Sequence, residues 1–195
     1  MLIGEVPERS KGADCKSVGY AFEGPNPSLS NMPPYSRGLF YFLELAMFYD
    51  SGLSFECQRC RYCCSSEPGY VFLSEKDIEN ASEALSIPKE EFLALYTRDV
   101  DYGLYYMVSL KEKDNYDCIF LSDNGCSIYK GRPLQCRTYP FWPSIVENRA
   151  NWESEKKSCP GIGKGCIVSK EQIDEMLQQG NKNIPFVKMK KKKHI

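Results

Sequence analysis

The residues with the clearest chemistry are the cysteines, which number 10 against a single histidine. Four of them lie in the segment Cys57-Gln58-Arg59-Cys60-Arg61-Tyr62-Cys63-Cys64. Two residues between thiolates let one backbone turn direct both sulfurs at a single point. Two such steps in succession direct three sulfurs at one centre. This suits an iron–sulfur cubane better than one zinc ion, because zinc usually takes two ligands from each of two turns. The segment therefore predicts a thiolate metal site.

Cys64 directly follows Cys63, and adjacent side chains diverge in an extended or turn backbone. The two residues either serve two neighbouring sites, which we favour, or Cys64 is a buried thiol. The more distant cysteines are numerous enough to complete two sites. The predicted metal ligands are Cys57, Cys60, Cys63, Cys64, Cys118, Cys126, Cys136 and Cys159. Cys15 and Cys166 are left outside these sites.

Cys159 is followed by Pro160. Bacterial ferredoxins place a remote Cys-Pro on a cluster whose other ligands come from a CxxCxxC run. By the same logic Cys159 would join the first three cysteines of the segment. Proline after cysteine is also ordinary turn chemistry, so both interpretations stay open.

Buried thiolates carry negative charge, which is costly to desolvate without compensation. Arg132 and Arg137 flank Cys136 on what we expect to be a helical turn. We therefore predict that these two arginines bind the cofactor. The alternative for each is a surface cation.

The composition includes 42% hydrophobic residues, a net charge of -1 and a pI near 6.0. These values allow a real core and give no electrostatic reason to expect nucleic-acid or membrane-surface binding. The longest apolar run, Leu39 to Tyr49, is interrupted by Glu44 and is too short to cross a bilayer. Met1 to Ser10 lacks the apolar centre of a secretory signal, so we expect a cytoplasmic protein with reduced thiols.

The first residues have no apolar periodicity and are interrupted by proline and glycine. Their sequence resembles the conceptual translation of a tyrosine tRNA gene, which would put the true start at Met32 or Met47. The alternative is an ordinary disordered leader. The expected organisation is a leader over 1–31, an N-terminal appendage over 32–53, a cysteine-cluster metal-binding domain over 54–180 and a basic tail over 181–195.

Helices and strands must hold these cysteines in place. The pattern of apolar and capping residues predicts a small α+β domain stapled by metal, with about three helices, short strands and irregular cysteine-rich loops. Ser74 and Asp77 form a capping box that opens one helix, Pro88 opens a second that runs to about Arg98, and Ser169 opens a third. Strands are expected over 70–73 and 104–110, with a hairpin between 120–121 and 127–129 around the turn 123–125. The stretch 37–49 fits a helix or a strand.

Several stretches together resemble one known family, the CxxCxxCC cysteine-cluster family, a YkgJ-like zinc- or iron-chelating domain. The resemblance covers about residues 54–166 and is carried by 55–64, 70–78, 116–121, 125–129, 132–143 and 159–163. It implies metal chelation without naming the metal. Some relatives resemble flagellin lysine N-methylases, which implies a link to protein methylation. No glycine-rich nucleotide loop is present here, which weakens an enzyme interpretation.

The favoured function is an iron–sulfur protein that transfers electrons or forms part of a protein-modifying enzyme. The alternative is a structural four-cysteine zinc module for interaction, without catalysis. Thiol redox or metal transfer is a third hypothesis. The expected partners are metal ions and a protein redox or modification partner. His194 lies in the basic tail and is not expected to be catalytic, and Tyr139 fits a core residue or a hydrogen-bond donor to sulfur.

Overall fold

The computed structural model describes residues 47–65 and 67–190, which belong to one compact unit that starts at Met47. The predicted leader, Cys15 and most of the stretch 37–49 lie outside the described residues. The strands are β1 (Leu53–Phe55), β2 (Thr97–Asp101), β3 (Tyr105–Leu110), β4 (Leu121–Ser122), β5 (Gly125–Cys126), β6 (Ile162–Val168) and β7 (Val187–Met189). The helices are α1 (Glu75–Leu85), α2 (Lys89–Tyr96), α3 (Leu134–Thr138), α4 (Pro143–Val146), α5 (Arg149–Glu155) and α6 (Lys170–Lys182), with 3₁₀ turns at Tyr62–Cys64 and Tyr129–Gly131. The predicted α+β class is confirmed.

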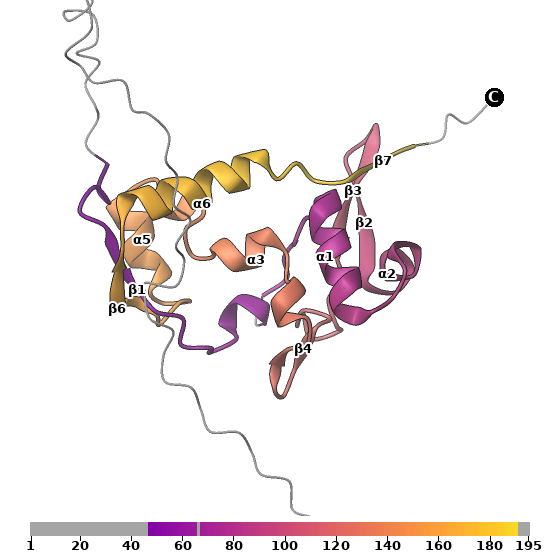
Figure 1. Ribbon diagram of the computed structural model, residues 1–195, viewed down its shortest axis with the longest axis horizontal. Helices are drawn as coiled ribbons and strands as arrows, with labels where there is room; N and C mark the ends of the chain where they lie inside the picture. Colours follow the sequence, from indigo (N-terminus) through magenta and orange to yellow (C-terminus); the bar gives the residue numbers. More distant parts are fainter. Residues whose placement is uncertain (1–46, 66, 191–195) are drawn as a thin grey trace, which may run out of the picture. The chain divides into compact units, whose positions relative to one another are not determined.

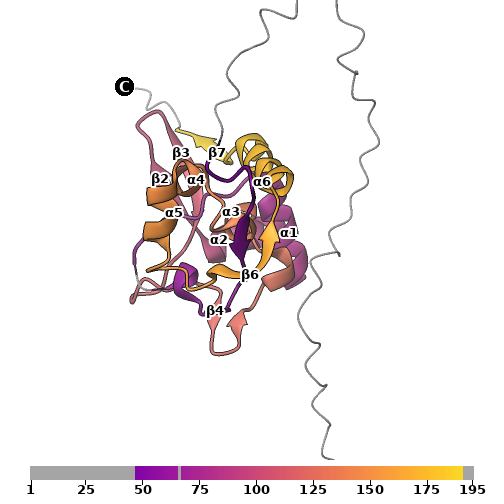
Figure 2. The same ribbon diagram turned by 90° about the vertical axis from the view of Figure 1, so that its left-hand side faces the viewer.

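The strands of the described residues form small antiparallel sheets that join distant parts of the chain. β1 pairs with β6, β3 lies between β2 and β7, and β4 pairs with β5. Figure 1 shows β1, β6 and α5 on one side of α3, and α1, α2, β2 and β3 on the other. Figure 2 shows the same elements after a 90° turn about the vertical axis, with α6 and β7 near the upper edge.

Two hydrophobic clusters match this division. The first core consists of Tyr49, Leu53, Phe141, Ile145, Val146, Trp152, Cys159, Ile162 and Ile173. The second core consists of Leu73, Ile78, Ala81, Phe92, Val108, Leu110, Phe120 and Ile128. Each is small, so contacts that connect the two must contribute to holding the domain together.

Hydrogen bonds at the start of α1 join this helix to α3 and to the end of α6. The Ser74 side chain accepts from the Asp77 N–H, and the Asp77 carboxylate accepts from the Ser74 N–H, which is the predicted capping box. The same buried carboxylate also accepts from the Leu134 N–H at 2.8 Å and from the Asn183 side chain at 2.8 Å. Asp77 therefore fixes the start of α3 and the end of α6 against α1.

The structure differs from some of the predicted elements. The stretch 70–73 makes a single bridge, Phe72 with Ser109, rather than a strand. Side chains take part of its hydrogen bonding, because the Val71 N–H donates to the Ser109 hydroxyl and the Phe72 N–H to the Gln135 side chain.

Other differences lie at element ends. α2 ends at Tyr96 because Thr97 begins β2, a strand that the sequence analysis does not predict. The predicted hairpin exists as β4 and β5, but the stretch 127–129 leads into a 3₁₀ turn rather than a strand. The chain from Val187 to Met189, within the segment assigned to a basic tail, pairs with β3. Lys188 and Lys190 form ion pairs with Asp99 and Asp101 on β2.

Candidate metal centre

The CxxCxxCC segment connects the two cores through its backbone. Its first end follows β1, where the Glu56 N–H donates to the Gly161 carbonyl at 3.1 Å. At its other end the Cys64 carbonyl accepts from the Cys118 N–H at 2.8 Å. Arg59 and Arg61 adopt positive φ, and these local turns reverse the chain direction between successive cysteines.

Cys57, Cys60 and Cys159 form the first thiol group. Cys159 is buried in the first core, whereas Cys57 and Cys60 are exposed on the segment beside it. Burial raises the pKa of Cys159, and the charges of Cys60 and Cys57 raise it further. Cys57 and Cys60 therefore lie close enough to Cys159 for their charges to act on it.

Tyr139 interacts with Cys159 of the first thiol group and with Cys63. Its hydroxyl donates to the Glu155 carboxylate at 2.6 Å, and its contact with Cys159 lowers the pKa of that thiol. The charges of both Cys159 and Cys63 act on the Tyr139 hydroxyl. This position agrees with the expected role of Tyr139 near sulfur, but Glu155 as its partner has no signal in the sequence.

The second thiol group consists of Cys63, Cys64, Cys118, Cys126 and Cys136. The β4–β5 hairpin carries Cys126, α3 carries Cys136, and Cys118 and Cys126 pack against the second core. The sulfurs of Cys63 and Cys64 lie 3.8 Å apart. Sulfurs from four separate parts of the sequence therefore gather around one region.

The thiols of the second thiol group change one another's pKa. Hydrogen bonding with Cys64 lowers the pKa of Cys63 to about 7, and it raises the pKa of Cys64. Burial raises the pKa of Cys136 to about 12, helped by the charges of Cys118, Cys63 and Cys126. A thiolate at one of these cysteines raises the pKa of its neighbours, because like charges repel. A bound cation would lower their pKa instead.

Arg132 is the arginine that acts on these thiols. Its charge lowers the pKa of Cys63, Cys126 and Cys136, and its guanidinium stacks over the Tyr129 ring at 3.9 Å. Arg137 lies on α3 directly after Cys136 and is exposed. Cofactor binding by either arginine stays a prediction.

In the part of the chain that the structure describes, no three Cys, His, Asp or Glu side chains converge tightly enough to hold one ion. The donor chemistry nevertheless fits a thiophilic metal. The eight predicted ligands are all free thiols, and none of them is joined to another by a disulfide. Clustered free thiols of this kind are the ligands of iron–sulfur and zinc centres.

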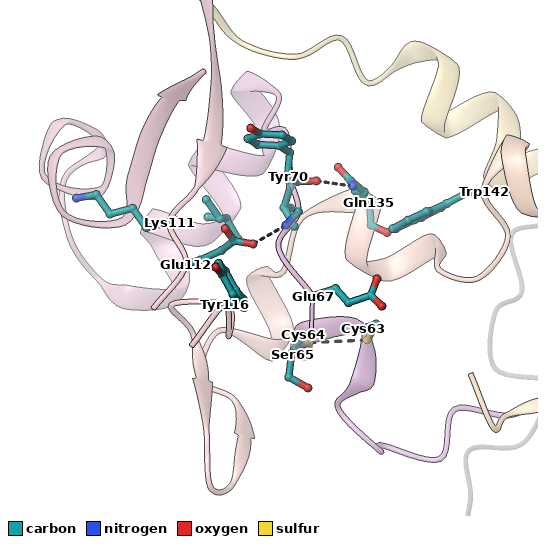
Figure 3. Close-up of a pocket in the computed structure, with 14 residues that line it drawn as sticks. Cys63, Cys64, Ser65, Glu67, Tyr70, Lys111, Glu112, Tyr116, Gln135 and Trp142 are labelled. Carbon is teal, nitrogen blue, oxygen red and sulfur yellow. Dashed lines mark hydrogen bonds between the residues drawn. The ribbon is translucent and has the colours of Figure 1, made fainter. Parts of the chain in front are cut away.

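A pocket of about 210 Å³ opens beside Cys63 and Cys64. Figure 3 shows these two sulfurs at one end, with Glu112 and Tyr116 on one side and Gln135 and Trp142 on the other. Gln135 is held in place because its amide donates to the Tyr70 carbonyl and its backbone carbonyl accepts from the Trp142 ring N–H. Cys63, Cys64 and Cys118 of the second thiol group line this pocket.

Residues 56–160, more than half of the chain, match the family described as "CxxCxxCC: Putative zinc- or iron-chelating domain". The chain belongs to this family. The match includes all eight predicted ligands, and it confirms the resemblance predicted from the sequence.

Two similar proteins come from Methanocaldococcus jannaschii, and both are named as uncharacterized. MJ0661 is 35% identical over 95 residues, covering 48% of this chain and 48% of the relative. MJ0939 is 29% identical over 132 residues, covering 65% of this chain and 43% of the relative. The chain thus spans less than half the length of each of these relatives. No solved structure matches significantly.

A helix that crosses a bilayer must be long and apolar. Within residues 47–65 and 67–190, no helix is both long enough and apolar enough to span a membrane.

Proposed function

We propose that this chain carries an iron–sulfur centre held by its clustered thiolates, and that it transfers electrons or forms part of a protein-modifying enzyme. The observation that carries the proposal is the gathering of eight free thiols, from segments between Cys57 and Cys159, into two thiol groups. A bound cluster would supply one-electron chemistry, while the chain supplies ligands, charge compensation and cover.

The spacing of the segment supports iron–sulfur over a single ion. Two CxxC steps offer three sulfurs to one centre, the charges of Cys60 and Cys57 act on Cys159, and Pro160 follows Cys159 as proline follows the remote cysteine of bacterial ferredoxins. The Tyr139 and Trp142 rings, which contact each other at 5.1 Å between centroids, pack against the first core near these sulfurs. Such aromatic cover limits solvent access to a cluster.

The proposal also includes a cytoplasmic location and a protein partner. Reducing compartments keep clustered thiols available for metal. A protein that exchanges electrons or is modified is the expected partner, and the exposed face at Cys57 and Cys60 offers it an approach.

A structural zinc module is the second candidate, and one observation favours it. The CxxCxxCC segment connects two small cores, so zinc bound by four cysteines would staple them together and add folding free energy without chemistry.

The deciding experiment is anaerobic purification of the full chain, followed by its visible spectrum and by iron, acid-labile sulfide and zinc assays on the same sample. Broad visible absorbance with iron and sulfide is expected. A colourless protein with stoichiometric zinc would refute the iron–sulfur proposal and support the structural alternative.

A further inference from the structure

A second pocket lies between α3 and α6, which run alongside each other (Figure 1). Its volume is about 340 Å³. Small-molecule sites in proteins typically have volumes of about 300–1,000 Å³, so this pocket is large enough for a compact ligand. None of the described residues that line it is charged, and none is a cysteine.

Aromatic and aliphatic side chains form most of the lining of the second pocket. Phe72 contributes from the segment before α1, and Phe141 and Trp142 contribute from the chain after α3. Met176 and Leu177 contribute from α6. Aromatic rings pack well against other flat rings, in stacked or edge-to-face arrangements. The lining therefore favours an apolar ligand with a planar ring.

Most of the polar side chains that line the second pocket are engaged within the chain. The Gln135 amide bonds to the backbone of the segment 70–72, and the Thr138 hydroxyl donates to a carbonyl of its own helix. The Asn183 amide donates to the Asp77 carboxylate at 2.8 Å. These groups hold the fold together, so they offer little hydrogen bonding to a ligand.

Gln135 and Trp142 line both the second pocket and the pocket beside Cys63 and Cys64. The Trp142 ring N–H donates to the Gln135 backbone carbonyl at 2.9 Å, which fixes this shared wall. A ligand in the second pocket would therefore touch the wall of the thiol pocket and leave the thiols themselves uncovered.

We propose that the second pocket binds a small, neutral molecule with a planar aromatic ring. A charged group would lose its hydration there and find no charged partner, which is costly. The exposed Asn181 amide, which also lines the pocket, can bind one polar atom of the ligand. This inference goes beyond the proposed function and does not require that the thiols bind metal.

The first test is equilibrium dialysis of the full chain against naphthalene, a neutral probe with two fused rings. Binding should saturate at one molecule per chain. Naphthoate, which adds a carboxylate to the same rings, should bind at least about tenfold more weakly. Absence of saturable naphthalene binding, or equal binding of both probes, would overturn the inference.

The second test locates the bound probe with a residue that has room for a side chain. Gly180 lines the pocket on the same face of α6 as Met176 and Leu177, which precede it by four and three positions. A Cβ at Gly180 would meet nothing within 4 Å. Gly180→Phe should therefore place a ring in the pocket without moving the backbone, and naphthalene binding should be lost.

Gln178→Phe is the matched control, because it adds the same ring to an exposed position of α6 that does not line the pocket. This variant should bind naphthalene as the wild type does. Circular dichroism checks the fold of both variants. Undiminished binding by folded Gly180→Phe, or equal loss in both variants, would place the probe elsewhere and overturn the inference.

A measurement on the wild-type chain covers the case in which Gly180→Phe does not fold. Bound naphthalene should slow hydrogen exchange of backbone amides in α3 and in the last turns of α6, while the amides of β2 should be unaffected. Mass spectrometry measures these regions in one sample. Protection confined to another part of the chain would show that the pocket is not the site.

Discussion

Cys63 and Cys64 show how two neighbouring thiols acquire opposite properties. Their sulfurs lie 3.8 Å apart, and hydrogen bonding between them stabilises a thiolate at Cys63 and a protonated thiol at Cys64.

In the metal-free protein, Cys63 should react first with iodoacetamide at pH 7. The thiolate is the nucleophile, and a pKa of about 7 leaves a large thiolate fraction there. Cys136, with a pKa raised to about 12, should react at least about tenfold more slowly. Peptide mass spectrometry over a time course measures both rates. Equal rates in the folded protein would contradict this, and unfolded protein provides the reference in which the difference disappears.

Arg132 and Arg137 form a matched pair on either side of Cys136. Arg132→Gln removes the charge that lowers the pKa of Cys63, so the midpoint of iodoacetamide reactivity at Cys63 should move to higher pH. Arg137→Gln should leave that midpoint unchanged, because the Arg137 side chain is exposed. A pH series on both metal-free variants measures the shift. A shift with Arg137→Gln alone would show that the charge assignment is wrong.

At the scale of elements, the junction of β1 and β6 controls the first thiol group. A Cβ at Gly161 would lie 2.3 Å from the Glu56 carbonyl oxygen, a contact that backbone atoms cannot accommodate without moving. Gly161→Ala should therefore separate Cys57 from Cys159, lower metal content and lower the Tm.

Gly180→Ala is the control for that change. Position 180 lies in α6 with open space around it, and alanine is favoured over glycine in a helix by up to about 1 kcal/mol. Its Tm should stay the same or rise, and its metal content should be unchanged. Equal metal content in both glycine variants would argue against the role of this junction.

Asp77 joins α1, α3 and α6 through one buried carboxylate. Asp77→Ala should lower the free energy of unfolding by about 3 kcal/mol, because buried donors such as the Leu134 N–H lose their acceptor. Glu83→Ala, an exposed change on the same helix, should cost less than about 0.5 kcal/mol. Denaturant unfolding at fixed metal loading compares the two. Similar losses in both variants would contradict the proposed network.

At the scale of the whole molecule, the described domain consists of two small cores bridged by a cysteine segment, by α3 and by α6. Metal bound to the segment would couple the cores more strongly than the few backbone hydrogen bonds can.

Metal removal should therefore loosen this bridge before it disturbs the cores. After chelation, backbone amides in residues 56–65 should exchange hydrogen faster, while the α1 amides around Ile78, in the second core, should stay protected. Hydrogen exchange followed by mass spectrometry measures both regions in one sample. Unchanged exchange over 56–65 would show that metal does not stabilise the segment.

The sequence alone determined the features that depend on a few adjacent residues. The capping boxes at Ser74 and Ser169 and the turn between β4 and β5 are local signals, and each predicted structure is present. The family match over 56–160 agrees with the metal-binding segment chosen from spacing.

Only the tertiary structure decided which distant groups meet. β2 and β7 form because each finds a partner in β3, and neither has a strong strand pattern of its own. Likewise, spacing could list eight thiols, but packing on two cores places Cys159 with Cys57 and Cys60, and Cys136 with Cys118 and Cys126. The reason is physical: a thiol's neighbours across many residues depend on how apolar surfaces are buried, and that information is spread over the whole chain.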